Sequence, residues 1–140
     1  MSGGADTDPL ALLRWEMERP PFHHYLKPEA IEADAELGTV TIALAFREDL
    51  ARGPNERSFH GGVIASLIDI AGHAAVAITI RRMAPTIDLR IDYLRPSSGD
   101  GLIARARMFK PGRTVARVDV DVTDTEGRLV AVGRGSFSTV

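Results

Sequence analysis

The stretch GGVIASLIDIAGHAAVAITI, residues 61–80, differs from everything around it and decides how the chain must fold. It holds one carboxylate, Asp69, and one histidine, His73, and its other residues are small or apolar. As a helix it would be about 30 Å long, enough to cross a membrane. An aspartate near its middle is costly in lipid, so we reject a membrane span. We expect a helix that other elements of a water-soluble chain wrap.

Alternation of apolar and polar residues on both sides of this helix predicts the strands that wrap it. Two strands are expected before it and four after it, over residues 27–36, 39–47, 87–93, 102–108, 114–123 and 128–139. Short turns link the last four, which predicts a mostly antiparallel meander. The fold class is α+β, with one long buried helix against one curled antiparallel sheet.

Length and composition favour one domain, residues 1–140. Hydrophobic residues make up 44% of the 140 residues and charged residues 26%, near the average for folded proteins. A short helix is expected over residues 9–19, ended by Pro20-Pro21, so residues 1–26 form a helical N-terminal extension. The chain has no cysteine, which excludes disulfides and thiolate catalysis. Without an export signal near Met1, we expect a cytoplasmic protein.

Charge is unevenly distributed along the chain. The formal net charge is −2, yet residues 81–140 hold eleven Lys and Arg against seven Asp and Glu. These basic residues are scattered through predicted strands and do not cluster with aromatic residues. We therefore expect a small polyanionic ligand, with no nucleic-acid or membrane partner.

Ser66, Asp69 and His73 are spaced three and four residues apart, so they form one polar stripe on an otherwise apolar helix. A carboxylate buried without partners costs several kcal/mol. A helix needed only for packing would carry an apolar residue at that position. The stripe therefore marks Asp69 as a candidate for chemistry, with a satisfied buried acid as the alternative.

Gly61 and Gly62 follow His60 at the expected helix start, where backbone N–H groups can bind an anion or a developing oxyanion. Asp69 lies eight residues beyond Gly61, about 12 Å along a helix. A nucleophile and oxyanion donors must both lie within about 3 Å of one reacting centre. If both groups are catalytic, they come from different chains, which predicts a dimer with two shared active sites.

Other kinds of site find little support in the sequence. His60, Asp69 and His73 resemble a two-histidine, one-carboxylate metal site only loosely, and His60 lies too far along the helix, so no metal is expected. There is no G-x-S-x-G, no P-loop and no G-x-G-x-x-G. We therefore predict neither a serine hydrolase triad nor a nucleotide cofactor.

The segment HGGVIASLIDIAGHAA, in which Asp69 lies nine positions after His60, closely resembles the signature of hotdog-fold acyl-CoA thioesterases of the phenylacetate-degradation (PaaI-like) type. TIDLRIDYLRP, residues 86–96, is similar to the strand after the central helix in those enzymes, and so is the turn at 110–113. The resemblance runs from about Pro28 to the C-terminus. It implies a central helix wrapped by five or six antiparallel strands, dimers, and often tetramers built as dimers of dimers.

The resemblance also implies roles for single residues. The matched aspartate acts as nucleophile or general base, a glycine amide polarises the thioester carbonyl, and a matched threonine hydroxyl positions water in some members. The family usually has Asn or Gln six residues before the histidine, where this chain has Pro54. A shifted loop would have to bring the next residue, Asn55, to the site instead. The candidate catalytic residues are Asp69, Gly61, Gly62, His60, Asn55 and Thr86.

The expected function is therefore hydrolysis of an acyl-CoA thioester to the free acid and CoA, without a cofactor. Candidates for contacting the substrate are His73 and Ser66 on the helix, and Arg95, Lys110 and Arg113 for the CoA phosphates. Two alternatives stay open: a non-catalytic acyl-CoA or lipid-binding protein of this fold, and an enoyl-CoA hydratase that uses His73. The sequence does not identify the acyl group, and residues 9–26 are candidates for a lid.

Overall fold

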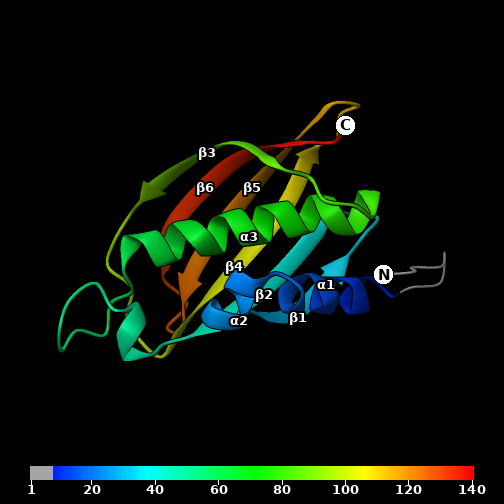
Figure 1. Ribbon diagram of the computed structural model, residues 1–140. Coiled ribbons are helices and arrows are strands. Elements are labelled where there is room, and N and C mark those ends of the chain that lie inside the picture. Colours follow the sequence, from blue (N-terminus) through cyan, green and yellow to red (C-terminus); the bar gives the residue numbers. More distant parts are fainter. Residues whose placement is uncertain (1–7) are drawn as a thin grey trace.

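In the computed structural model, which describes residues 8–140 apart from the side chain of Lys110, a six-stranded antiparallel sheet curls around one long helix, α3 (Figure 1). The predicted α+β layout is confirmed. The helices are α1 (Pro9–Glu18), α2 (Pro21–Leu26) and α3 (Gly61–Ile80), with a 3-10 turn at Glu48–Leu50. In spatial order, the strands are β1 (Glu29–Asp34), β2 (Thr39–Ala45), β4 (Gly101–Lys110), β5 (Val115–Asp124), β6 (Leu129–Ser138) and β3 (Thr86–Tyr93).

The strand order corrects the meander that the turns predicted. β4, β5 and β6 do form one, but β3 pairs with β6 and not with β4. The link from Tyr93 to Gly101 therefore crosses three strand spacings, about 14 Å. It looked like a hairpin turn because Pro, Ser, Gly and Asp are turn residues in a long link as well as in a short one.

Asp124 holds this crossing in place. Its carboxylate is almost fully buried and accepts hydrogen bonds from the backbone N–H groups of Ser98, Glu126 and Arg128. Burial alone would raise the pKa of Asp124, but these hydrogen bonds outweigh it and hold the pKa below its ordinary value.

The core lies between α3 and the inner face of the sheet. Leu67, Ile68 and Ala71 are fully buried on α3, and a Leu or Ile side chain buried in this way contributes roughly 1.5–3 kcal/mol. Glycine permits the close approach of helix and sheet, since a Cβ on Gly133 of β6 would lie 2.5 Å from Ile68 Cγ2. By length and composition α3 could cross a membrane, yet 61% of that stretch is buried inside the fold.

The N-terminal extension packs beside α3 on the same face of the sheet. α1 contacts β1 and α3, and α2 follows it directly (Figure 1). Proline starts α2 as it does α1, because the fixed backbone angle of proline suits the first turn of a helix. The prediction for residues 9–19 is confirmed, while residues 1–7 of the extension lie outside the described part.

Candidate active site

Asp69 and Thr86 meet where α3 lies against the start of β3. Thr86 Oγ1 donates a hydrogen bond to Asp69 Oδ1 at 2.7 Å. No residue that the structure describes donates to Oδ2 of Asp69. Because Asp69 is only partly buried, Oδ2 is open to water or to a substrate.

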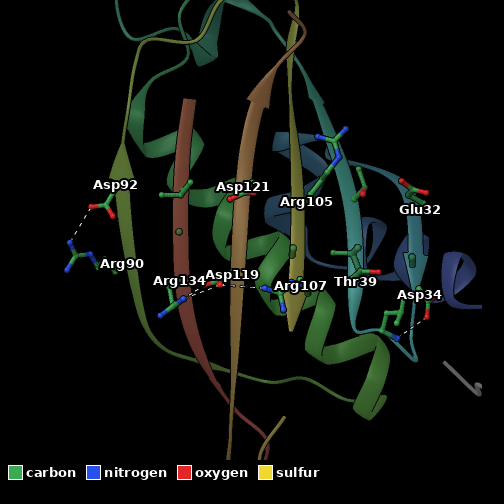
Figure 2. A pocket seen from close by; sticks show the side chains of 17 residues that line it. Glu32, Asp34, Thr39, Arg90, Asp92, Arg105, Arg107, Asp119, Asp121 and Arg134 are labelled. Atoms are coloured by element: carbon green, nitrogen blue, oxygen red, sulfur yellow. Dashed lines mark hydrogen bonds and ion pairs between the residues drawn. The ribbon is translucent and has the colours of Figure 1, made fainter. Parts of the chain in front are cut away.

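A β-bulge turns Thr86 toward the helix. The register of β3 with β6 shifts between Thr86 and Asp88, which leaves one extra residue, Ile87. Arg90, an even number of positions further along the strand, lies on the outer face of the sheet, away from α3 (Figure 2). A regular strand would place Thr86 on that same face, and the bulge re-aims it toward Asp69.

The backbone N–H groups at the start of α3 differ in their partners. His60 is the N-cap, and its Nδ1 accepts from the Gly62 N–H at 2.8 Å. The His60 carbonyl accepts from the N–H groups of Val63 and Ile64. Among the described residues, the Gly61 N–H has no acceptor. Of the two glycines considered as carbonyl polarisers, Gly61 is thus the one with a free donor.

Tyr93, at the other end of β3, holds this first helical turn. Its hydroxyl donates to the Gly61 carbonyl oxygen at 2.7 Å. Sequence reasoning placed Tyr93 on the same strand face as Leu89 and Ile91 but gave it no role. The alternation shows which face a side chain takes, whereas the partner on that face depends on how the helix start is positioned over the strand.

One subunit does not bring Asp69 and Gly61 together. They lie on one continuous helix, eight residues or about 12 Å apart along its axis. β3 touches both groups, through Thr86 at its start and through Tyr93 at its end. Each half of the candidate site is therefore attached to one end of the same strand.

Ser66 and His73, two candidate substrate-binding residues, are both engaged inside the subunit. Ser66 Oγ donates to the carbonyl one turn earlier at 2.9 Å. His73 Nε2 accepts from the Ala84 N–H at 3.1 Å and so ties down the segment that leads into β3. His73 Nδ1 lies 3.9 Å from Glu16 Oε2 of α1, a buried acid that the sequence pattern did not single out. These contacts offer nothing specific to a hydratase mechanism.

Two of the histidines make the folded state sensitive to pH. Burial lowers the pKa of His73 and of His23 below the ordinary value of 6.5, against an opposing effect of Glu16. Just below that value the unfolded chain binds more protons than the folded one, so stability falls as the pH drops from about 6.5 through the folded-state pKa values. We expect a lower Tm at pH 5 than at pH 7.5, measured by circular dichroism. The double variant His23→Gln, His73→Gln should flatten this dependence, and an unchanged slope would contradict the assignment.

The remaining candidates do not converge in one subunit. Asn55 is exposed in the loop before α3, in the left-handed conformation that asparagine tolerates. Arg95 lies beside the start of β6, at Val130, whereas Arg113 lies in the turn beside the end of β6. These two arginines are at opposite ends of one strand, and the side chain of Lys110 lies outside the described part.

A wide hollow of about 1070 Å³ lies on the opposite, outer face of the sheet (Figure 2). Three of its arginines pair with carboxylates of the same hollow, and Arg134 Nε donates to Asp119 Oδ1 at 2.7 Å. Neither Asp69 nor Gly61 lines it. No group of three or more His, Cys, Asp or Glu among the described residues is arranged to hold a metal ion. The candidate residues Asp69 and Gly61 therefore lie apart from this hollow, on α3.

Comparison with known proteins identifies the family of this chain. The thioesterase superfamily model matches residues 58–131, which include Gly61, Asp69 and Thr86. A Halobacterium salinarum protein provisionally named an esterase is 41% identical over 115 residues, 74% of this chain and 76% of that protein. Mouse acyl-coenzyme A thioesterase 13 is 37% identical over 81 residues, 55% of this chain and 57% of that protein. The chain thus spans little more than half the length of the mouse relative.

Solved structures give the same answer for the fold. One from the thioesterase superfamily has a TM-score of 0.89 at 33% identity, over 96% of this chain and 100% of that one. The Escherichia coli PaaI protein from the phenylacetic acid degradation operon has a TM-score of 0.77 at 23% identity, over 91% and 96%. The resemblance read from residues 60–75 is confirmed, and the chain belongs to the thioesterase superfamily.

Proposed function

We propose that this protein hydrolyses acyl-CoA thioesters in active sites shared by two subunits. The observation that carries the proposal is that β3 is bonded at one end to Asp69 and at the other to Gly61. If two β3 strands pair antiparallel about a two-fold axis, the Thr86 end of one meets the Tyr93 end of the other. Asp69 then faces the partner's Gly61. The acyl-CoA substrate is supported by the name of the mouse relative.

The two edges of the sheet differ in a way that favours β3 as the interface. α1 packs against β1 and so discourages strand pairing at that edge. β3 has no such cover and exposes the apolar Ile87 and Tyr93, which are 55% and 53% exposed in one subunit. An uncovered edge strand that exposes apolar side chains is a template for pairing with a second copy.

In the proposed reaction, the partner's Gly61 N–H polarises the thioester carbonyl and stabilises the oxyanion that develops on it. Either Asp69 Oδ2 attacks the carbonyl carbon, or it takes a proton from a water that attacks. The carbon–sulfur bond breaks, and CoA leaves as the thiolate. If Asp69 itself attacks, a water then hydrolyses the resulting acyl-aspartyl anhydride, which releases the free acid and restores the carboxylate. Thr86 holds the other carboxylate oxygen so that Oδ2 is aimed at the substrate. Asn55, Arg95 and Arg113 are proposed to contact the substrate from the partner or at the rim.

A panel of acyl-CoA substrates tests the activity directly. Release of free thiol is followed with a thiol reagent, which is unambiguous because the protein has no cysteine of its own. Thiol release supports hydrolysis. Binding without release would instead identify a non-catalytic acyl-CoA-binding protein, and hydration of an enoyl-CoA would identify a hydratase.

Ile87→Lys should dissociate the dimer and reduce hydrolysis in parallel, because a lysine on the edge strand opposes pairing. Analytical ultracentrifugation gives the assembly mass, to be compared with 15.2 kDa for one chain. Val140→Lys is the matched control, since Val140 is an exposed apolar residue at the chain end. A wild-type chain that is monomeric and fully active would refute the shared site.

We further propose that two dimers assemble into a tetramer and that the protein acts in the cytoplasm. The outer face of the sheet offers an alternating set of arginines and carboxylates (Figure 2). Such a face can pair with a second copy through complementary charges, and the contact would weaken as salt is added. Sedimentation at low and high ionic strength checks the second assembly step.

A further inference from the structure

A cleft of about 320 Å³ lies between α1 and the C-terminal end of α3. This volume lies at the lower end of the range for small-molecule sites, roughly 300–1,000 Å³. The candidate active-site residues Asp69, Gly61 and Thr86 do not line the cleft. Its apolar lining comes from both helices and the residues that follow α3, namely Leu12, Trp15, Ala77, Ile78 and Met83.

The rim of the cleft carries more positive than negative charge. Arg19, Arg81 and Arg82 line it, and Glu16 is the acidic residue among them. The Glu16 carboxylate is already engaged, 3.3 Å from Arg19 Nη2 and 3.9 Å from His73 Nδ1. An apolar floor with a cationic rim suits a ligand that combines an anionic head with an apolar tail.

Arg19 shows where an anionic head would bind. Its guanidinium carbon lies 4.7 Å from the centroid of the Trp15 ring, so the group stacks on one wall of the cleft. Its Nε is buried and has no hydrogen-bond partner among the described residues. A buried donor without a partner is destabilising, and a carboxylate oxygen would satisfy it. Guanidinium groups bind carboxylates through paired, parallel hydrogen bonds.

Arg81 is unusual for its position at the end of α3. Its φ is 61°, the left-handed conformation that glycine normally adopts at a helix C-terminus. α2 ends in the same way at Lys27, so this backbone conformation by itself assigns no role to the Arg81 side chain. The carbonyl groups that end α3 disfavour an anion nearby. The positive charges of the arginines that line the cleft oppose this effect, and Arg82 also donates a hydrogen bond to the Thr139 carbonyl oxygen.

We propose that this cleft binds a small amphipathic carboxylate, with the head at Arg19 and the tail over Ala77 and Ile78 beside Trp15. A short fatty acid has this chemistry. Thioester hydrolysis releases an acid of the same class, so the cleft would bind the product of the reaction; this link alone rests on the proposed function. The binding site itself does not depend on it.

The experiment is a fluorescence titration with octanoate. Trp15 is the only tryptophan in the chain, so its emission reports this cleft. We expect a saturable change with octanoate and about tenfold weaker binding of 1-octanol, which has the same tail without the charge. Arg19→Gln should weaken octanoate binding by a similar factor, and Arg82→Gln should weaken it by less. Thermal melts first show that both variants fold. Arg117→Gln, an exposed arginine of β5 outside the cleft, should bind octanoate normally.

Three results would overturn the proposal. An equal response to octanol would show apolar partitioning only. Octanoate binding that Arg19→Gln leaves unchanged would show that the acid binds elsewhere, for example at Asp69. The absence of both a saturable emission change and calorimetric heat would show that octanoate does not bind. Octanoate has no thioester bond to hydrolyse, so the titration stays interpretable even if the protein proves inactive towards acyl-CoA.

Discussion

Asp69→Asn is expected to lower kcat for acyl-CoA hydrolysis on the order of 10³-fold, as for loss of a catalytic base, and further if Asp69 is the nucleophile. Asparagine has nearly the same shape and can still accept the hydrogen bond from Thr86 Oγ1 at the Oδ1 position. The fold and the dimer should therefore survive, while the group at the Oδ2 position can neither attack nor remove a proton. Steady-state thiol release, with sedimentation on the same sample, measures both effects.

The matched control is Asp88→Asn, since Asp88 is an exposed acid on β3 two residues from Thr86. It should hydrolyse acyl-CoA at the wild-type rate. If Asp69→Asn also keeps a near-normal kcat, the proposed mechanism is wrong, whatever the activity of the wild-type protein shows about the family.

Gly61→Pro should lower kcat by about 10²- to 10³-fold, the usual cost of one oxyanion donor. Proline lacks the backbone N–H but is well tolerated at the first position of a helix, which Gly61 occupies. The preceding residue, His60, already has the extended conformation that proline requires of its neighbour, with φ −58° and ψ 139°. The substitution thus removes the one donor without an acceptor at little cost to α3.

Gly61→Ala controls for size, because it keeps the N–H and its Cβ would lie in ordinary contact, 3.5 Å from Tyr93. It should retain most of the activity. Equal loss in the alanine and proline variants would show that space at this position matters, and not the amide.

Mixing the two inactive variants tests whether the sites are shared. In a mixed dimer, one site contains both defects and the other combines an intact Asp69 with an intact Gly61 from the opposite chain. After unfolding and joint refolding at equal amounts, half the dimers are mixed, so about a quarter of the wild-type activity should return. If each subunit holds a complete site, mixing restores nothing.

The sequence alone predicted the central helix and the wrapping strands because their patterns are local. The apolar run at 61–80 and the alternation in β5 each require burial on a defined face, whatever the partner. The position of β3 beside β6 was missed because it depends on where a long link crosses the sheet. That path is set by Asp124, whose hydrogen bonds join residues far apart in the chain.

The candidate site was predictable to the same extent. Asp69 and Gly61 stood out as a charge on an apolar helix and a flexible helix start. Which glycine has a free N–H could not be read from the sequence, because it depends on how the His60 ring turns back on Gly62. The hydrogen bond from Tyr93 and the buried Glu16 beside His73 are likewise tertiary contacts, which leave no periodic signal.

The bulge at Ile87 makes the number of residues between Ala84 and Asp88 more critical than the identity of their side chains. One residue removed between Ala84 and Asp88 would restore regular alternation and turn the Thr86 hydroxyl to the far face of the sheet, away from the carboxylate that it orients. Many substitutions at Ile87 would leave that geometry intact. We therefore expect relatives that keep the reaction to share the same number of residues between the helix end and the strand, while apolar residues replace one another at this position.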